Sequence, residues 1–253
     1  MKITFLGTGT SLGVPMVACN CAVCRSIDPR DKRLRSAVLV ETKGRNIIID
    51  IGPDFRQQML RAEVQDIDDV LITHEHRDHI NGIDEVRAFN FICEKNIPLY
   101  ATARVHAAIR EGFSYIFDNT YPGLPQITQH TIAAYQNFNL GDVCIQVFEV
   151  MHYQLPVLGF RINDFSYITD ANFMDDRALE IIAGSKILVL NALRKEPHIS
   201  HFTLREAIEM AQKINAEQTY FTHISHQLGK HAEVSSILPP NIHLAYDGLS
   251  LVC

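Results

Sequence analysis

Apolar and polar positions alternate along the chain in two periods, a pattern typical of short strands and helices that follow one another. Apolar runs occupy residues 2–6, 36–41 and 46–51, and the last two flank the turn sequence Thr42-Lys43-Gly44-Arg45. Runs of this length bounded by turn residues predict strands, and the second and third together predict a β-hairpin. The N-terminal part of the chain is therefore expected to form a sheet.

The remainder of the chain repeats this alternation. Further strands are predicted at 70–73, 97–100, 143–150, 157–161, 165–168, 186–191 and 218–221, and helices at 53–62, 80–91, 103–111, 174–182 and 204–214. Between 113 and 130 the period is lost among aromatic residues and prolines, so we expect an irregular loop. Two similar halves predict an α/β (α+β) fold, a four-layer αββα sandwich with the helices outside, as a single domain over residues 1–253.

Composition narrows the classes of partner. The chain has 253 residues, 47% of them hydrophobic, with a net charge of −6 and no long Lys/Arg block, which argues against long nucleic acid as a partner. No apolar run approaches the roughly 18 residues that span a bilayer. Glycines interrupt the N-terminus where the apolar part of a signal peptide would lie. We therefore expect a cytoplasmic protein with no membrane partner.

Candidate metal ligands gather in His74-Glu75-His76-Arg77-Asp78-His79, directly after the predicted strand at 70–73. Three imidazoles and a carboxylate are more ligands than one ion usually takes from one segment, so this spacing predicts two ions that share a site. The alternative is a histidine-rich surface turn. Three further candidates follow predicted strands, and they can meet the first group if the strands end on a common rim. They are His152, Asp170 and His223.

A second candidate site lies in Cys19-Asn20-Cys21-Ala22-Val23-Cys24. Six cysteines could form a disulfide framework, but the chain is large and the cluster is tight, which favours metal ligation. Three thiolates need one more ligand for a closed tetrahedral zinc site, and His226 is the best candidate. A redox-active pair of Cys21 and Cys24 is the competing interpretation, although the cluster lacks a thioredoxin-like context.

These motifs resemble those of the metallo-β-lactamase superfamily, over essentially the whole chain. The matching segments are Thr73 to His79, Met151-His152, Thr169-Asp170 and Thr222-His223. The resemblance implies an αββα fold with a binuclear centre, and it implies that Asp50 supports the ligands of this centre without binding the ions itself. It places His74, His76 and His152 on one ion, Asp78, His79 and His223 on the other, and Asp170 as the bridge between them.

A subgroup related to the phosphoribosyl cyclic phosphate phosphodiesterase of phosphonate catabolism is similar in further motifs. These are Gly7-Thr8-Gly9, the cysteine cluster, Thr222 to Gln227 and the tail Tyr246-Asp247-Gly248-Leu249. Relatives in PQQ biosynthesis also carry a similar cysteine cluster. In this subgroup and in ribonuclease Z, a histidine before the corresponding helix contacts the phosphate and can act as general acid. His201 fits that position better than His198, the alternative being a solvated histidine at a helix N-terminus.

Three features depart from the subgroup pattern. Tyr153 follows His152, Asp170 is followed by Ala171-Asn172 instead of a hydroxyl residue, and the aromatic segment from Phe113 to Pro125 matches no motif. We expect these residues to shape the substrate pocket. They leave the identity of the substrate open.

The sequence as a whole predicts a binuclear metal-dependent hydrolase, a phosphodiesterase that cleaves a small or cyclic phosphodiester with a hydroxide shared by two ions. The expected cofactors are two zinc or manganese ions and one structural zinc, with His201 and Asp78 as catalytic residues. Pairing of two chains is expected on family grounds alone. Alternatives are an RNA endonuclease like ribonuclease Z, a thioester or lactone hydrolase, and a binding module of the PQQ-biosynthesis type. The endonuclease would need a basic RNA-binding arm, which the sequence does not show.

Overall fold

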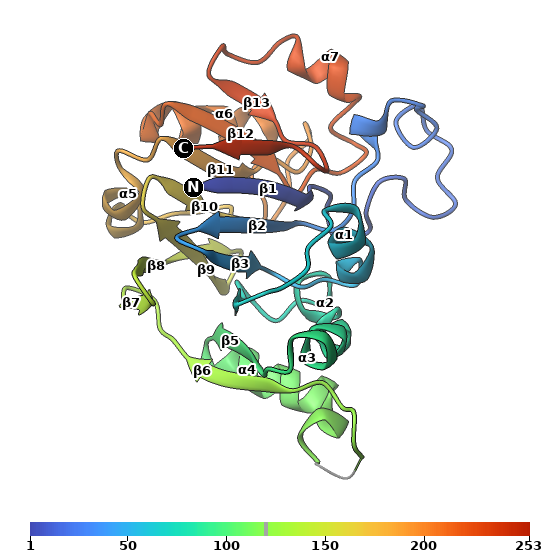
Figure 1. The fold of residues 1–253 in the computed structure, drawn as a ribbon. Helices are drawn as coiled ribbons and strands as arrows, with labels where there is room; N and C mark the ends of the chain where they lie inside the picture. The colour runs from blue at the N-terminus through green and yellow to red at the C-terminus, as the bar shows by residue number, and fades with distance from the viewer. Residues whose placement is uncertain (119–120) are drawn as a thin grey trace.

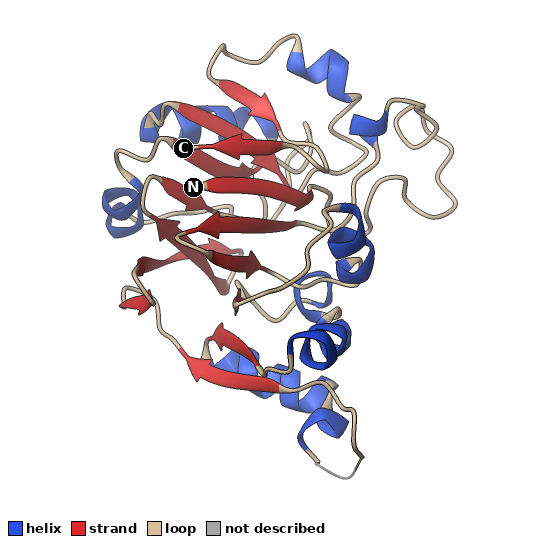
Figure 2. Ribbon diagram, in the orientation of Figure 1, coloured by secondary structure: helices blue, strands red, loops and turns tan. Residues whose placement is uncertain are grey.

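The computed structural model describes residues 1–118 and 121–253, and it consists of two seven-stranded sheets with helices on their outer faces (Figure 1, Figure 2). The first sheet has the order β14 (Ser250–Val252), β1 (Lys2–Gly7), β2 (Ala37–Thr42), β3 (Arg45–Ile49), β4 (Asp69–Leu71), β5 (Ile97–Ala101) and β6 (Ile127–Thr131). The second has the order β13 (Ile242–Leu244), β12 (Gln218–Thr222), β11 (Ile187–Asn191), β10 (Phe165–Tyr167), β9 (Leu155–Ile162), β8 (Val143–His152) and β7 (Asn137–Leu140). This arrangement confirms the predicted four-layer sandwich.

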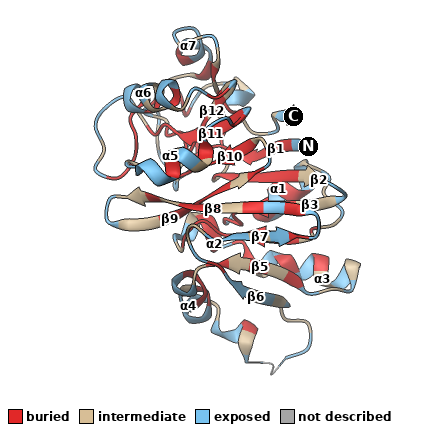
Figure 3. Ribbon diagram, turned by 90° about the vertical axis from the view of Figure 1, so that its left-hand side faces the viewer, coloured by how far each residue is buried: buried red, intermediate tan, exposed pale blue. Residues whose placement is uncertain are grey.

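Strand β2 shows why both faces of a sheet are covered. Side chains alternate between the two faces of a strand, and here both sets are apolar. Val38 and Val40 enter the core between the two sheets, whereas Ala37 and Leu39 pack beneath the helices of the first half. Figure 3 shows the same result for the central strands, whose residues are mostly buried.

Helices close the two outer layers. The cores beneath them include residues of α1 (Phe55–Arg61), α3 (Arg87–Cys93) and α4 (Ala103–Gly112) on the first sheet, and of α5 (Asp176–Ile182), α6 (Leu204–Ile214) and α7 (His231–Ser235) on the second. A capping box begins α6, in which the Glu206 N–H donates to Thr203 Oγ1 (3.2 Å) and the Thr203 N–H donates to Glu206 Oε2 (2.8 Å). This cap fixes the start of the helix just after His201.

The prediction of one helix over 80–91 is wrong. The chain instead forms α2 (Arg77–Ile80), the 3-10 turn η2 (Ile83–Val86) and then α3. The break falls at Gly82, whose N–H donates to the Ile51 carbonyl (2.7 Å) instead of continuing the helix, and where a Cβ would overlap the Gly52 carbonyl oxygen and lie 2.6 Å from Phe55 Cβ. Only a residue without a side chain allows this close approach of two segments.

The irregular loop predicted over 113–130 is wrong in part. It contains the 3-10 turn η3 (Ser114–Phe117) and ends in strand β6, while Asn119 and Thr120 lie outside the described residues. The predicted helices at 53–62 and 174–182 begin two residues later, at Phe55 and Asp176. Strands β7, β13 and β14, helix α7 and the 3-10 turn η1 (Pro29–Asp31) were not expected. Among the described residues, no helix has the length and apolarity to cross a membrane.

Candidate metal centre

The candidate ligands follow strand ends that meet at one side of the sandwich. His74 comes three residues after β4, His152 ends β8, Asp170 comes three residues after β10, and His223 directly follows β12. The short helix α2 then turns the chain, so that the ring of His79 lies 4.2 Å from the ring of His74, measured between centroids. Two sheets thus contribute to one cluster.

The structure brings all seven predicted ligands of the binuclear centre together. Together with His201 they form three groups, two of which share Asp170, and within each group the possible ligand atoms lie within 4.8 Å of one another: His74, His76 and Asp170; Asp78, His79 and His223; and His152, Asp170 and His201. Asp170 belongs to two groups, as a bridging carboxylate would. His152 is also close to the first group, because its ring centroid lies 5.1 Å from that of His76.

Carboxylates face imidazoles across the centre of the cluster. Asp170 Oδ2 lies 3.3 Å from His79 Nε2, and Asp170 Oδ1 lies 3.2 Å from His223 Nε2. Asp78 Oδ2 lies 3.2 Å from His79 Nε2 and 3.5 Å from His223 Nε2. Lone pairs of both kinds of group therefore converge on the same small volume.

Buried nitrogens without partners show that this donor set fits metal ions. The Nε2 atoms of His74, His79 and His223 are buried and have no hydrogen-bond partner among the described residues. Such an atom costs free energy unless something else satisfies it, and a divalent cation does so. Imidazoles combined with carboxylates are ligands that suit zinc or manganese.

Charge within the cluster agrees with this donor set. Burial lowers the pKa of His74 well below its usual value, so that its imidazole is neutral and can act as a ligand. Burial alone would raise the pKa of Asp170, but its contacts with the imidazoles of His223, His79 and His201 hold it well below its usual range. The carboxylate is therefore ionised.

Asp50 supports the cluster without belonging to it. This fully buried carboxylate accepts hydrogen bonds from the Thr73 N–H (2.9 Å) and the Thr73 hydroxyl (3.0 Å), and it lies 2.7 Å from His79 Nδ1. A proton on Nδ1 leaves the Nε2 lone pair of His79 free, which is how carboxylates orient metal-binding histidines.

Three residues of the site have a left-handed backbone. The φ angles are 67° at Asp50, 55° at Asp170 and 54° at His223. A residue with a Cβ pays roughly 1–2 kcal/mol for this conformation, so it persists only where the surrounding structure holds it. It turns the chain sharply after a strand and directs each side chain towards the cluster.

His201, predicted to contact the phosphate, lies directly beside the candidate ligands. It is buried, and its Nε2 lies 3.1 Å from Asp170 Oδ1. Burial lowers its pKa to about 4. The preceding Ser200 contributes its carbonyl oxygen, which lies 2.8 Å from His152 Nδ1. The geometry is compatible with a proton donor and with a further ligand.

The cysteine cluster also assembles with its predicted fourth partner. Cys19, Cys21, Cys24 and His226 have ligand atoms within 4.8 Å of one another, and His226 Nδ1 lies 3.4 Å from Cys19 Sγ and 3.3 Å from Cys21 Sγ. All six cysteines are free thiols. A hydrogen bond from the Cys24 N–H lowers the pKa of Cys21 to about 6, which favours the thiolate that binds metal. This donor set fits a structural zinc.

The sequence did not reveal several residues that hold the site. The Thr169 hydroxyl donates to Asp170 Oδ2 (2.5 Å), and the Asn191 amide bonds both backbone groups of Ala171 (2.8 and 2.9 Å). Asn191 left one signal, since an amide at the end of an otherwise apolar predicted strand indicates a buried polar contact. Thr169 left none.

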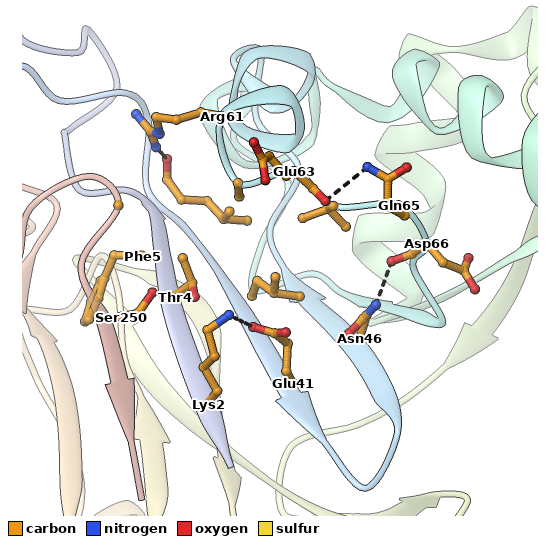
Figure 4. A pocket seen from close by; sticks show the side chains of 15 residues that line it. Lys2, Thr4, Phe5, Glu41, Asn46, Arg61, Glu63, Gln65, Asp66 and Ser250 are labelled. Atoms are coloured by element: carbon orange, nitrogen blue, oxygen red, sulfur yellow. Dashed lines mark hydrogen bonds and ion pairs between the residues drawn. The ribbon is translucent and has the colours of Figure 1, made fainter.

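A separate cavity of about 470 Å³ lies away from these clusters, on the outer face of the first sheet (Figure 4). Lys2 and Glu41 form an ion pair across its floor (2.6 Å), and the Asn46 amide donates to the Asp66 carbonyl at its rim (2.9 Å). None of the candidate metal ligands lines this cavity. We therefore place the chemistry at the strand ends.

Comparisons with known proteins agree with the fold and the motifs. Residues 45–224 match the model of the beta-lactamase superfamily domain. A protein of Porphyromonas gingivalis named octanoyltransferase is 39% identical over 256 residues, which cover 100% of this chain but 51% of that protein. The chain thus spans about half the length of the first curated relatives it matches.

Solved structures give the same family. The crystal structure of a diphosphatase from the PhnP family superposes with a TM-score of 0.93 at 39% identity, covering 100% of this chain and 97% of that one. Zn²⁺-bound PqqB from Methylobacterium extorquens shares the fold, with a TM-score of 0.85 at 19% identity and full coverage of both chains. Proteins of this fold typically bind divalent metals such as zinc. The chain therefore belongs to the metallo-β-lactamase superfamily of hydrolases and, within it, is similar to the PhnP family.

Proposed function

We propose that this hydrolase is a binuclear metal-dependent phosphodiesterase that cleaves a small or cyclic phosphodiester. The observation that carries the proposal is the position of His201, which places a possible proton donor beside Asp170 and the other candidate ligands. The PhnP-family relative of known structure, named as a diphosphatase, also acts on a phosphoryl group. A net charge of −6 favours a small substrate over a long nucleic acid.

Each residue of the cluster has a role in this proposal. His74, His76, Asp78, His79, His152, Asp170 and His223 would hold two divalent ions, which supply positive charge and activate water near neutral pH. Asp50 would keep His79 in the tautomer that ligates. Asp170 would help to keep the two ions at a fixed distance from each other. These residues thereby fix where the substrate phosphate can lie.

His201 would supply the proton that the leaving oxygen needs. Its imidazole is neutral in the buried site, because burial lowers its pKa to about 4. An anionic phosphate beside the ring favours the protonated form and raises that pKa again. His201 is thus expected to gain its proton when substrate binds and to pass it on as the P–O bond breaks.

We further infer that Cys19, Cys21, Cys24 and His226 hold a structural zinc. His226 lies just after strand β12, whereas the cysteines lie in the long segment between β1 and β2, shown in blue in Figure 1. A closed site would fasten this segment to the second half of the chain. Metal analysis of the purified protein is then expected to give about three ions per chain.

The His201→Ala variant tests the catalytic assignment. We expect kcat for a cyclic phosphodiester with an alkoxide leaving group to fall by about 10²–10⁴-fold, the usual contribution of a general acid, whereas bis(p-nitrophenyl) phosphate, whose leaving phenolate needs no proton, should change little. Metal content should not change. His130→Ala, at an exposed histidine outside the cluster, is the matched control and should keep full activity. Undiminished turnover of the cyclic phosphodiester in His201→Ala would remove the general acid from the proposal, and loss of an ion would make His201 a ligand.

A thioester hydrolase is the second candidate, favoured by one observation. The P. gingivalis relative is named for transfer of an octanoyl group, and an acyl carbonyl is also a substrate for activated water at a metal centre. This chemistry does not require His201. Turnover of an octanoyl thioester that exceeds phosphodiester turnover, and that survives in His201→Ala, would favour this candidate over the phosphodiesterase.

A further inference from the structure

An arginine joins the histidine motif to the hairpin of β8 and β9. Arg104, the second residue of α4, lies with its Nε 2.9 Å from Glu75 Oε1, and its Nη2 donates a hydrogen bond to the Pro156 carbonyl oxygen (2.6 Å). Glu75 stands between the first two histidines of the motif, and Pro156 lies in β9. One guanidinium thus contacts two segments, each of which carries or adjoins candidate ligands.

The end of this hairpin is poorly held by its own main chain. In the pairing of β8 with β9, Pro156 faces Met151, the residue before His152. Proline has no N–H to donate, and the Met151 N–H donates instead to the Phe173 carbonyl oxygen (2.9 Å). Neither residue of the pair therefore donates a main-chain hydrogen bond to the other. Arg104 supplies a contact from outside the hairpin that fixes this part of β9.

The position of Arg104 in its helix indicates a role outside the helix. The first turn of a helix disfavours a cation, because the N-terminal end of the helix dipole is positive. One turn further on, the chain has Ala107 and Ala108, so the helix offers Arg104 no acidic partner there. Alanine at position 104 would suit the helix better. The arginine is therefore explained by its partners Glu75 and Pro156.

The contacts of Arg104 are partly open to water. Its side chain is 40% exposed and that of Glu75 is 21% exposed. Ion pairs in such places add little to the free energy of unfolding, because water screens the charges and the side chains lose conformational freedom. Removing Arg104 should therefore disturb the position of the two segments more than the stability of the fold.

We propose that Arg104 is a positioning residue for one ion of the proposed binuclear centre, on which this inference rests. Its contacts with Glu75 and Pro156, which we call the Arg104 clasp, hold the segment of the motif around Glu75 at a fixed distance from His152. The ring centroids of His76 and His152 lie 5.1 Å apart, so one ion can take both as ligands. The clasp keeps the two imidazoles at this separation.

The other ion has separate support. Its candidate ligands are Asp78, His79 and His223, and Asp50 lies 2.7 Å from His79 Nδ1. Among the described residues, no hydrogen bond or ion pair joins the side chains of these four to the Arg104 clasp. Loss of the clasp is therefore expected to weaken one ion and to spare the other, whereas a general loss of structure would weaken both.

Manganese binding to protein freed of its active-site metals tests the inference. Manganese is the probe because thiolates prefer zinc, which keeps the cysteine site out of the measurement. Electron paramagnetic resonance of free Mn²⁺ during a titration gives a Kd for each bound ion. We expect Arg104→Ala to weaken one of two ions by about 10-fold, the lower end of the usual loss for a residue behind a ligand, and to leave the other unchanged. Native affinity for both ions would overturn the clasp, whereas a native protein that binds fewer than two ions would contradict the proposed binuclear centre.

Arg205→Ala is the matched control. Arg205 is the second residue of α6 and pairs with Glu209 (3.9 Å), but both belong to one helix and are mostly exposed. This variant should bind both ions as the native protein does. Metal-free Arg104→Ala should unfold within about 3 °C of the metal-free native protein, because an exposed ion pair contributes little. A larger drop, with both ions weakened, would make Arg104 a structural residue and overturn the inference.

Two further variants locate the affected ion. Asp50→Asn acts on His79, so its combination with Arg104→Ala should weaken both ions, one through each change. A combination in which one ion keeps its native affinity would contradict the inference. Glu75→Gln should weaken the same ion as Arg104→Ala and should add nothing to it, since the two residues act as a unit. Additive losses would show that Arg104 does not act through Glu75.

Discussion

Asp50 contacts one candidate ligand and controls which of its nitrogens is free. Its carboxylate is fully buried, lies 2.7 Å from His79 Nδ1 and is itself fixed by Thr73. An amide in its place could still bond Thr73, but it would no longer hold a proton on Nδ1 through a charged contact. Replacing the carboxylate by an amide should therefore weaken metal binding more than it lowers the stability of the fold.

We expect Asp50→Asn to lower the affinity for the active-site metals by about 10–100-fold, as is usual when such a partner of a metal-binding histidine is lost. Competition with a chromogenic chelator measures this change. Asp164→Asn, at an exposed ion pair with Lys186, is the control and should bind metal as the native protein does. Native affinity in Asp50→Asn would contradict the role given to this carboxylate.

Residue type and spacing allowed the candidate ligands to be predicted, because a metal site requires particular atoms. His74, Asp170 and His223 could be chosen from the sequence and are neighbours in the structure. The contacts of Asn172 and Asn191 could not, because their hydrogen bonds depend on which segments the fold places together. A threonine or asparagine has many such uses, whereas a dense histidine motif has few.

At the scale of elements, Gly82 separates α2 from η2 and allows two segments to cross closely. Gly82→Ala should destabilise the protein by about 1–3 kcal/mol, because the new methyl group meets backbone and Phe55 atoms that cannot move easily. Denaturant unfolding measures this loss. Gly44→Ala meets no atom within 4 Å and should lose only about 1 kcal/mol through its positive φ. Equal losses of stability in the two variants would show that the cost of Gly82→Ala comes from the backbone and not from the close approach of two segments.

The elements that the sequence predicted well are those with long periodic patterns. Helix α6 and strands β2 and β8 have enough apolar positions to define a face. Strands β13 and β14 are short strands at the edges of the two sheets, and they form because β12 and β1 offer free edges to pair with. Strand β6 could not be predicted because its residues are exposed or half-buried and show no apolar pattern, and it is held by pairing with β5.

At the scale of the whole molecule, Arg33 and His231 link the long N-terminal segment to the end of the chain. The buried Arg33 guanidinium donates to the Ala245 carbonyl (2.6 Å) and to the hydroxyl of Thr8 (2.7 Å), and it lies 3.2 Å from His231 Nδ1. That contact needs a neutral imidazole as acceptor. Burial and the charge of Arg33 lower the pKa of His231 to about 4 from its usual value of 6.5.

This arrangement predicts a pH dependence of stability. Between about pH 6.5 and 4 the unfolded chain binds a proton at His231 that the folded protein does not, so the free energy of unfolding falls as the pH is lowered through this window. His231→Asn keeps an acceptor for Arg33 and does not titrate. Its loss of stability over the window should be smaller by the order of 1 kcal/mol, measured by urea unfolding at several pH values. Parallel curves for the two proteins would contradict this.

Both sheets contribute ligands to the metal centre, so bound ions would affect how slowly the folded protein opens. His74, His76, Asp78 and His79 follow the first sheet, whereas His152, Asp170 and His223 follow the second. Ions bound between them would cross-link the two sheets, so that metal release and opening of the sandwich become a single slow event. A folded molecule would therefore keep its metals for as long as it stays folded.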